Sequence, residues 1–179
     1  MEKYLITFVV LGVVSFLYLK LAIKYRIIDK PNERSSHSKI TVRGGGIIFP
    51  IAILLFFFFN NYEYPFFTIG VVLISIISFL DDIFTLSAKV RFPFQFVAVF
   101  LILFQIDFPF EPIYIFALLL LFGVGIVNMF NFMDGINGIT GLYAMSVLLG
   151  FYFINDIEAI VNPELILFSF ISLVVFGFY

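Results

Sequence analysis

Long apolar runs follow one another along almost the whole of this 179-residue chain, separated by short polar connections. A membrane-spanning helix needs roughly 17 to 25 predominantly apolar residues. About seven stretches approach that length: 4–23, 44–60, 62–80, 92–110, 112–130, 136–154 and 163–179. Transmembrane β-strands alternate apolar and polar residues, and these stretches do not. The sequence therefore predicts an all-α, polytopic membrane helix bundle that forms a single transmembrane domain over residues 1–179. Proline is expected to mark helix starts, at Pro65, Pro93, Pro112 and Pro163.

The composition excludes a soluble fold. Hydrophobic residues make up 63% of the chain and charged residues only 12%, whereas a soluble domain is typically about half apolar and a quarter charged. The net charge of −2 gives no indication of nucleic acid binding, so no nucleic acid partner is expected. The chain has no Cys, which excludes disulfide and thiolate chemistry.

Basic residues gather in alternate connections. The first and third connections contain most of them: Lys24, Arg26, Lys30, Arg34, Lys39, Arg43, Lys89 and Arg91. The second, fourth and sixth connections contain no Lys or Arg. Because Lys and Arg accumulate in cytoplasmic loops, we expect the N-terminus outside the cell and the first, third and fifth connections in the cytoplasm.

Two adjacent carboxylates, Asp81 and Asp82, stand at the end of the third run. An ionisable residue at the edge of a membrane span is costly and indicates a functional site. Two neighbouring carboxylates also repel each other unless a cation or a proton lies between them. The alternative is a solvated helix end with a local Asp cap.

The first connection carries Arg34, His37 and Arg43, followed by three glycines. Glycine lets a backbone approach a ligand closely, and the planar guanidinium of Arg suits phosphate. The alternatives are attraction of basic residues to anionic lipid headgroups and a glycine surface used for helix packing.

A third motif lies at the end of the fifth run, where Asn131, Asp134 and Asn137 recur every three residues. On a helical turn that spacing places them on roughly one side. Carboxylate and amide oxygens suit a hard cation such as Mg²⁺. An Asx and glycine turn between two helices is the alternative.

The three motifs together resemble a known family. They read Asp29-x-Pro-Asn-x-Arg34-x-x-His37 with Arg43-Gly-Gly-Gly, then Asp81-Asp82 with Arg91-Phe and Gln95, then Asn131-Phe-Met-Asp134-Gly-Ile-Asn137-Gly. In this order and spacing, over about residues 25–145, they resemble the polyprenyl-phosphate N-acetylhexosamine-1-phosphate transferases. That family includes undecaprenyl-phosphate N-acetylglucosamine-1-phosphate transferases and the phospho-N-acetylmuramoyl-pentapeptide translocase.

The resemblance implies an enzyme of the bacterial inner membrane with a cytoplasmic active site. Such an enzyme moves a sugar-1-phosphate from a UDP-N-acetylhexosamine to undecaprenyl or polyprenyl phosphate and releases UMP. The reaction would start the synthesis of an envelope polysaccharide such as lipopolysaccharide or cell wall. The expected cofactor is Mg²⁺, with Mn²⁺ as an alternative; membrane lipid is a further partner, and a homodimer is left open.

The resemblance also assigns residues. Asp81 and Asp82 are the catalytic candidates, with Asp81 at the lipid phosphate as base or nucleophile, Asp82 at the metal or its water shell, and the reverse order left open. Asn131 joins Asp82 as a metal ligand. The candidates for substrate binding are Arg34, His37, Arg43, Lys89, Arg91, Asp134 and Asn137.

The sequence departs from the family in two respects. Family members continue with a Gly-Asp segment that supplies a metal-binding aspartate and with a His-rich cytoplasmic loop, which this chain lacks; several also have Asp where Asn137 stands. The chain ends at Tyr179 within an apolar run, so we expect the N-terminal part of a longer family domain. An inactive truncated remnant is therefore an alternative. A non-enzymatic transport or assembly protein is disfavoured, because a transporter places charges near mid-helix.

Overall fold

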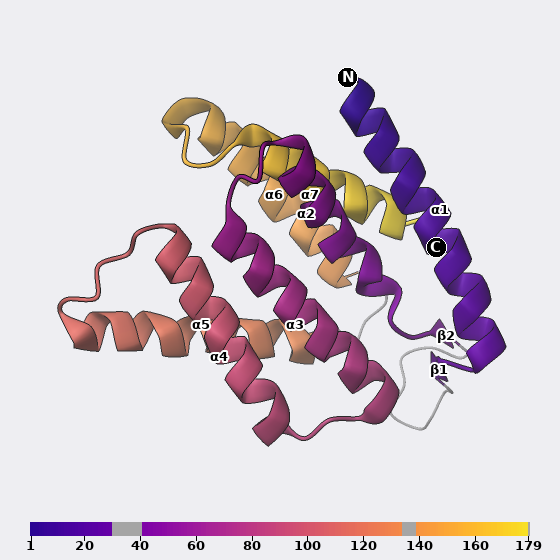
Figure 1. The fold of residues 1–179 in the computed structure, drawn as a ribbon, viewed down its shortest axis with the longest axis horizontal. Helices are drawn as coiled ribbons and strands as arrows, with labels where there is room; N and C mark the ends of the chain where they lie inside the picture. The colour runs from indigo at the N-terminus through magenta and orange to yellow at the C-terminus, as the bar shows by residue number, and fades with distance from the viewer. Residues whose placement is uncertain (30–40, 134–138, 179) are drawn as a thin grey trace.

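The computed structural model of the chain describes residues 1–29, 41–133 and 139–178. Within them the chain forms seven α-helices, one short 3₁₀-helix and a pair of two-residue strands (Figure 1). The elements are α1 (Glu2–Tyr25), β1 (Ile28–Asp29), β2 (Thr41–Val42), η1 (Gly45–Ile47), α2 (Ile48–Phe59), α3 (Pro65–Phe84), α4 (Ala88–Gln105), α5 (Ile113–Met133), α6 (Ile139–Glu158) and α7 (Pro163–Phe176). The prediction of an all-α, multi-helix membrane protein is confirmed. In the described part, β structure is limited to the antiparallel pair β1–β2, in which Ile28 lies opposite Val42.

Five of the described helices are long and apolar enough to cross a membrane: α1, α3, α4, α5 and α6. The other two predicted spans form shorter apolar helices, because α2 has 12 residues and α7 has 14. The α2 helix is shortened at both ends. The glycines before it form a turn and η1 instead of regular helix, and Asn60 ends it by donating from Nδ2 to the Phe56 carbonyl at 2.9 Å.

The helix starts agree with the proline pattern except in α4. Pro65 and Pro163 occupy the first turns of α3 and α7, and Pro112 directly precedes α5. The expectation for Pro93 is wrong, because α4 begins five residues earlier, at Ala88, and Pro93 lies inside it. Ser87 has an extended backbone there and starts the helix. Lys89 and Arg91 consequently belong to α4 and not to a connection.

Small residues allow the helices to approach closely, as is usual where van der Waals packing drives helix association in lipid. A Cβ atom on Gly70 of α3 would lie 3.1 Å from the Ala98 carbonyl oxygen of α4. One on Gly123 of α5 would lie 2.6 Å from Val99 Cγ1 of α4. Two apolar clusters form the core: Leu11, Ile48, Ala52 and Val175 between α1, α2 and α7, and Val99, Phe116, Leu120 and Val124 between α4 and α5.

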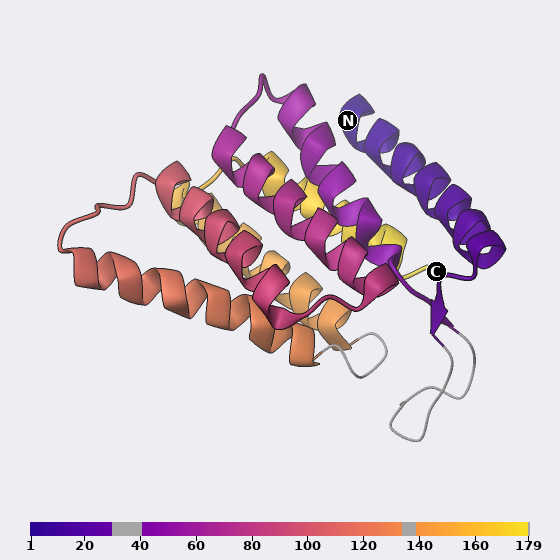
Figure 2. The ribbon, with the colours of Figure 1, turned by 60° about the horizontal axis from the view of Figure 1, so that its bottom comes forward.

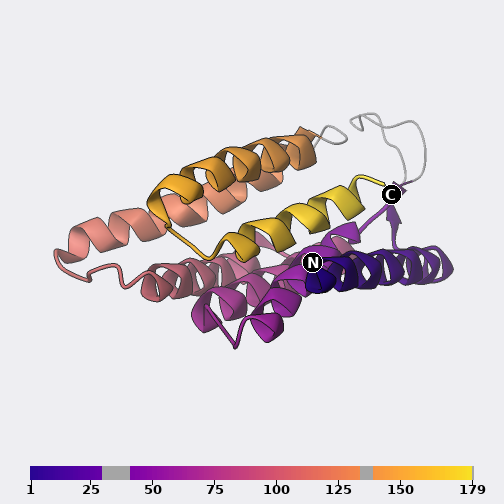
Figure 3. The same ribbon diagram turned by 90° about the horizontal axis from the view of Figure 1, so that it is seen from above.

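The helices form layers. Seen from above, α1 to α4 lie in one layer, α7 packs over it, and α6 lies on the far side of α7 (Figure 3). The C-terminal ends of α1, α3 and α5 and the N-terminal ends of α4 and α6 lie at the same end of the bundle (Figure 2). The described ends of the odd-numbered runs therefore lie at one end of the bundle, as the alternation of connections predicts.

The opposite end is held by polar contacts between two connections. The Asn162 backbone N–H donates to the Tyr64 hydroxyl oxygen at 2.9 Å, and Asn162 Nδ2 donates to Glu63 Oε2 at 2.6 Å. Burial raises the pKa of Tyr64 above its ordinary value. These bonds join the start of α3 to the start of α7. The acidic pair lies at the other end of α3.

Candidate functional site

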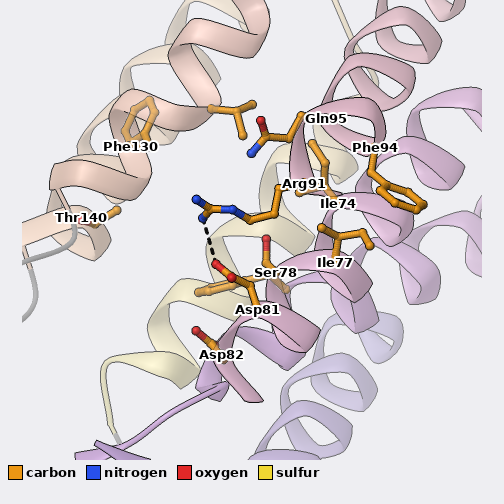
Figure 4. A pocket seen from close by; sticks show the side chains of 12 residues that line it. Ile74, Ile77, Ser78, Asp81, Asp82, Arg91, Phe94, Gln95, Phe130 and Thr140 are labelled. Carbon is orange, nitrogen blue, oxygen red and sulfur yellow. Dashed lines mark hydrogen bonds and ion pairs between the residues drawn. The ribbon is translucent and has the colours of Figure 1, made fainter. Parts of the chain in front are cut away.

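One face of α3 carries the acidic pair. Helix α3 continues to Phe84, beyond the predicted end at residue 80, so that Asp81 and Asp82 lie within its last turn. Residues 74, 77, 78, 81 and 82 have the spacing of one helical face. They line a cavity of about 410 Å³ (Figure 4). Its other walls come from α2, α4, α5 and α6, through Phe49, Arg91, Phe94, Gln95, Val127, Phe130 and Thr140.

Asp81 is held by two hydrogen bonds. Its Oδ2 accepts from Arg91 Nη1 at 2.9 Å, and its Oδ1 accepts from the Leu86 backbone N–H at 2.6 Å. The intervening Thr85 adopts a left-handed conformation with φ 52°. The local capping that the sequence left as an alternative is therefore present at Asp81, and the same contacts join the end of α3 to the start of α4.

The acidic pair occupies an unfavourable position on its helix. The C-terminal end of a helix carries partial negative charge, so that each carboxylate there costs roughly 0.3–1 kcal/mol. The Arg91 guanidinium offsets this cost at Asp81. Departures from a local stability rule concentrate at functional sites. The placement of two carboxylates here therefore favours a site.

Asp82 lines two hollows. It is exposed and lines the cavity, and it also lines a second, mainly apolar groove of about 500 Å³ between α2 and α3. The two hollows share Phe49, Ile74, Ser78 and Asp82. Asp82 thus lies where the more polar cavity meets the apolar groove.

Arg91 extends into the cavity from α4 (Figure 4). Its guanidinium has five N–H donors in a planar arrangement, and Nη1 serves Asp81. The Nε atom is buried and has no hydrogen-bond partner among the described residues. Arg91 therefore brings positive charge and an unused donor to the cavity.

A pair of amides fixes α4 against α5 one helical turn from Arg91. Gln95 is 8% exposed, and its Oε1 accepts from Asn128 Nδ2 at 2.8 Å. Asn128 Nδ2 also donates to the Val124 carbonyl of its own helix at 2.8 Å. Gln95 appears in the sequence motif but not among the predicted site residues. A buried amide within an apolar helix is the signal that identifies such a contact.

Gly44 brings the backbone after the first connection close to α3. It has φ 74°, and a Cβ atom there would collide with the Tyr18 hydroxyl and lie 2.9 Å from Phe79 Cε2. The Tyr18 hydroxyl donates to the Arg43 carbonyl at 2.6 Å. The packing role that the sequence left open for the glycines is thus present at Gly44.

The structure brings together part of the predicted site. Asp81, Asp82 and Arg91 line the cavity, whereas Lys89 and Arg43 are exposed and do not line it. Arg34, His37, Asp134 and Asn137 lie outside the described residues, and Asn131 lies in α5 with its side chain outside the described part. The sequence reasoning missed Ser78, Phe130 and Thr140. Ser78 was identifiable, because it precedes Asp82 by one helical turn.

The carboxylates fit a cation that a phosphate substrate brings with it. Among the described residues no group of three or more His, Cys, Asp or Glu side chains gathers to hold a metal ion. Mg²⁺ is commonly bound through one or two carboxylates plus substrate phosphates and water. Asp82 supplies one carboxylate for such a cation, whereas both oxygens of Asp81 already accept hydrogen bonds. The described donors therefore suit Mg²⁺ shared with a substrate.

Comparisons with known proteins agree with the motif analysis. Residues 64–179 match the family model of glycosyl transferase family 4. The chain is 28% identical over 152 residues to a "Probable undecaprenyl-phosphate N-acetylglucosaminyl 1-phosphate transferase" of Bacillus subtilis, a match that covers 76% of the chain and 42% of the relative. It is 31% identical over 142 residues to the undecaprenyl-phosphate alpha-N-acetylglucosaminyl 1-phosphate transferase of Salmonella typhi, covering 70% of the chain and 39% of the relative.

A protein of the same printed name from Thermotoga maritima is 28% identical over 154 residues, a match covering 83% of the chain and 50% of that relative. The chain thus spans half or less of the length of these curated relatives. No solved structure gives a significant match.

Proposed function

Because the chain belongs to glycosyl transferase family 4, we propose that it carries the site of a phosphoglycosyl transferase, which moves a sugar-1-phosphate from a nucleotide sugar to a polyprenyl phosphate. The observation that supports this proposal is the junction at Asp82 of a cavity containing Arg91 with an apolar groove. A phosphate-bearing donor suits the first hollow, and the isoprenoid tail of a lipid acceptor suits the second.

The groove orients the acceptor more than it provides affinity. An isoprenoid chain that leaves the bilayer for a protein groove exchanges one apolar environment for another, so burial alone gives little free energy. The groove's closeness to Asp82 matters for another reason. A tail lying between α2 and α3 places the acceptor phosphate beside the donor cavity, and correct placement of reacting groups accounts for much of the rate of phosphoryl transfer.

Arg91, Asp81 and Asp82 have different proposed roles in the transfer. Arg91 stabilises negative charge on the phosphoryl oxygens through charge-assisted hydrogen bonds. Asp81, both of whose oxygens already accept hydrogen bonds, orients Arg91. Asp82 faces both hollows, and we assign it to the acceptor phosphate as the base or as its orienting group. This is the reverse of the order first expected for the two carboxylates.

Mg²⁺, when bound, would neutralise charge on the diphosphate, and Mn²⁺ is an alternative. Asp82 and Asn131 are the side chains that we propose to hold it, because a carboxylate has two oxygens and serves a metal and a phosphate at once. The proposed donor is UDP-N-acetylhexosamine, with UMP as the released product. The proposed location is the cytoplasmic face of the bacterial inner membrane, in line with the basic first and third connections.

A lipid-dependent release assay tests the proposal. Membranes that contain the chain are incubated with labelled UDP-N-acetylglucosamine, undecaprenyl phosphate and Mg²⁺. We expect release of UMP that requires the lipid acceptor and stops when the metal is chelated. Membranes that contain the Asp82→Asn variant at equal abundance are the control.

The same assay tests whether residues 1–179 carry out the transfer by themselves. A chain that is inserted and folded but releases no UMP would exclude transfer by these residues alone. Release without any acceptor requirement would exclude the polyprenyl phosphate as substrate.

A further inference from the structure

We propose that Thr140 is a further ligand-binding residue of the cavity, and that its hydroxyl and the Nε–H of Arg91 together hold one anionic oxygen of a bound phosphate group. This inference rests on the proposed function, because a phosphate-bearing substrate is what that function brings to the cavity. Nothing in the motif pattern includes Thr140, which follows the last motif.

Two residues that line this cavity each have an unsatisfied polar atom. Arg91 Nε and Thr140 Oγ1 are buried, and neither has a hydrogen-bond partner within the described residues. Both residues line the cavity. A buried polar atom without a partner costs free energy, so its presence in a native structure calls for an explanation such as a ligand. Elsewhere in the described chain, Thr68 in the first turn of α3 has the same kind of buried hydroxyl but lines neither hollow.

The two residues come from different helices and line the same cavity. Arg91 projects from α4 and Thr140 from the first turn of α6, and their side chains point toward one another from opposite sides of the cavity (Figure 4). The first turn of a 20-residue helix carries partial positive charge. A group bound between them therefore meets a guanidinium on one side and the positive end of a helix on the other.

The hydrogen-bond donors of Arg91 and Thr140 indicate which ligand the cavity binds. The Arg Nε–H only donates, and a Thr hydroxyl donates when an acceptor is available. Two donors that line the same cavity, one of them charged, suit an acceptor with negative charge. A phosphoryl oxygen meets that requirement, and a cation does not. The oxygen belongs either to the diphosphate of a nucleotide sugar or to the phosphate of a lipid acceptor.

Binding measurements on the full chain in detergent test the proposal with UDP and, separately, with a polyprenyl phosphate. Thr140→Val keeps the shape of the side chain and removes the hydroxyl, and Thr140→Ser keeps the hydroxyl. Thr68→Val is the matched control, because it removes a buried, unpartnered hydroxyl outside the cavity. We expect Thr140→Val to weaken binding about tenfold or more, as loss of a hydrogen bond to a charged group does. Thr140→Ser and Thr68→Val should bind within about twofold of the wild type.

The pattern across the probes names the source of the oxygen. Weakened binding of UDP alone assigns it to the nucleotide sugar, weakened binding of the polyprenyl phosphate alone assigns it to the lipid, and weakening of both supports a shared contact. Unchanged affinity of Thr140→Val for both probes overturns the inference, as does a wild-type chain that binds neither. If Thr140→Val does not fold, Thr140→Ala compared with Thr140→Ser decides by the same criterion, with melting and gel filtration as checks. UMP release is measured separately. If binding depends on Thr140 but the wild-type chain releases no UMP, only the proposed function is overturned. If the wild-type chain releases UMP but Thr140→Val binds both probes normally, only this inference is overturned.

Discussion

Arg91 Nη1 lies 2.9 Å from Asp81 Oδ2, and this contact joins the first turn of α4 to the last turn of α3. Each of the two side chains is 24% exposed. A partly exposed ion pair of this kind contributes at most about 1 kcal/mol to stability. Its main effect is on side-chain orientation. It holds the Asp81 carboxylate toward the guanidinium, while the neighbouring Asp82 lines both hollows.

Both aspartates are expected to be needed for transfer. Asp82→Asn should lower lipid-dependent UMP release by about 100-fold or more, since loss of a general base costs about 10² to 10⁴ in rate. Asp81→Asn should lower both release and melting temperature, because the new amide presents a donor group in place of an acceptor for Arg91. Rates near wild type in either variant would refute the catalytic assignment, and an unchanged melting temperature of Asp81→Asn would refute the structural role of its contact with Arg91.

Gly44 is expected to be intolerant of a side chain. Gly44→Ala requires a left-handed backbone and overlaps the Tyr18 hydroxyl and Phe79, so we expect a loss of about 1–3 kcal/mol in stability, measured by thermal unfolding in detergent. Gly125→Ala is the matched control, since no atom lies within 4 Å of the added Cβ and the residue is inside α5. The control should unfold at or above the wild-type temperature. A stable Gly44→Ala protein would contradict the close approach of this backbone to α1 and α3.

The amide pair between α4 and α5 should show energetic coupling. Gln95→Leu or Asn128→Leu leaves one amide without its interhelical partner, at a cost of about 1–3 kcal/mol. The double variant should recover part of that loss. A double-mutant cycle on unfolding free energies should give a coupling of about 0.6 kcal/mol or more, which is the average for polar contacts between membrane helices. Strictly additive losses would show that the two amides act independently.

Filling the groove should affect only the lipid acceptor. Leu54→Trp places a large ring in the apolar groove between α2 and α3. We expect KM for polyprenyl phosphate to rise about tenfold, within the range for a changed apolar pocket, while KM for the UDP-sugar stays constant. Leu118→Trp, on an exposed part of α5, is the control and should change neither constant. A rise in the UDP-sugar KM alone would place the lipid tail elsewhere.

The orientation in the membrane is testable because the chain contains no Cys. Ser87→Cys lies between α3 and α4, and Ile160→Cys lies between α6 and α7. A membrane-impermeant thiol reagent applied to intact cells should label Ile160→Cys and leave Ser87→Cys unlabelled until the cells are opened. The reverse pattern would place the N-terminus inside and the proposed site outside the cytoplasm.

Several features of the fold follow from short stretches of sequence. The existence of each helix was predictable, because the length of an apolar run decides whether a segment forms a helix in lipid. Starts at Pro65 and Pro163 were also predictable, since proline at the first helical position loses nothing. The expectation for Pro93 was wrong because α4 begins earlier, after Ser87, whose carbonyl accepts from the backbone N–H groups of Val90 and Arg91. The helix continues through the proline and includes the motif residue Arg91.

The sequence by itself determined that this is a helical membrane protein with most of its basic residues in alternate connections and an acidic pair at the end of the third run, because apolar length and the spacing of charges are local properties of a chain. Only the tertiary structure decided which of these groups meet. Arg91 forms an ion pair with Asp81, Gln95 accepts a hydrogen bond from Asn128, and Thr140 faces Arg91 from another helix. Such pairings depend on how helices pack, and packing is set by small residues such as Gly70 and Gly123 at contacts far apart in sequence.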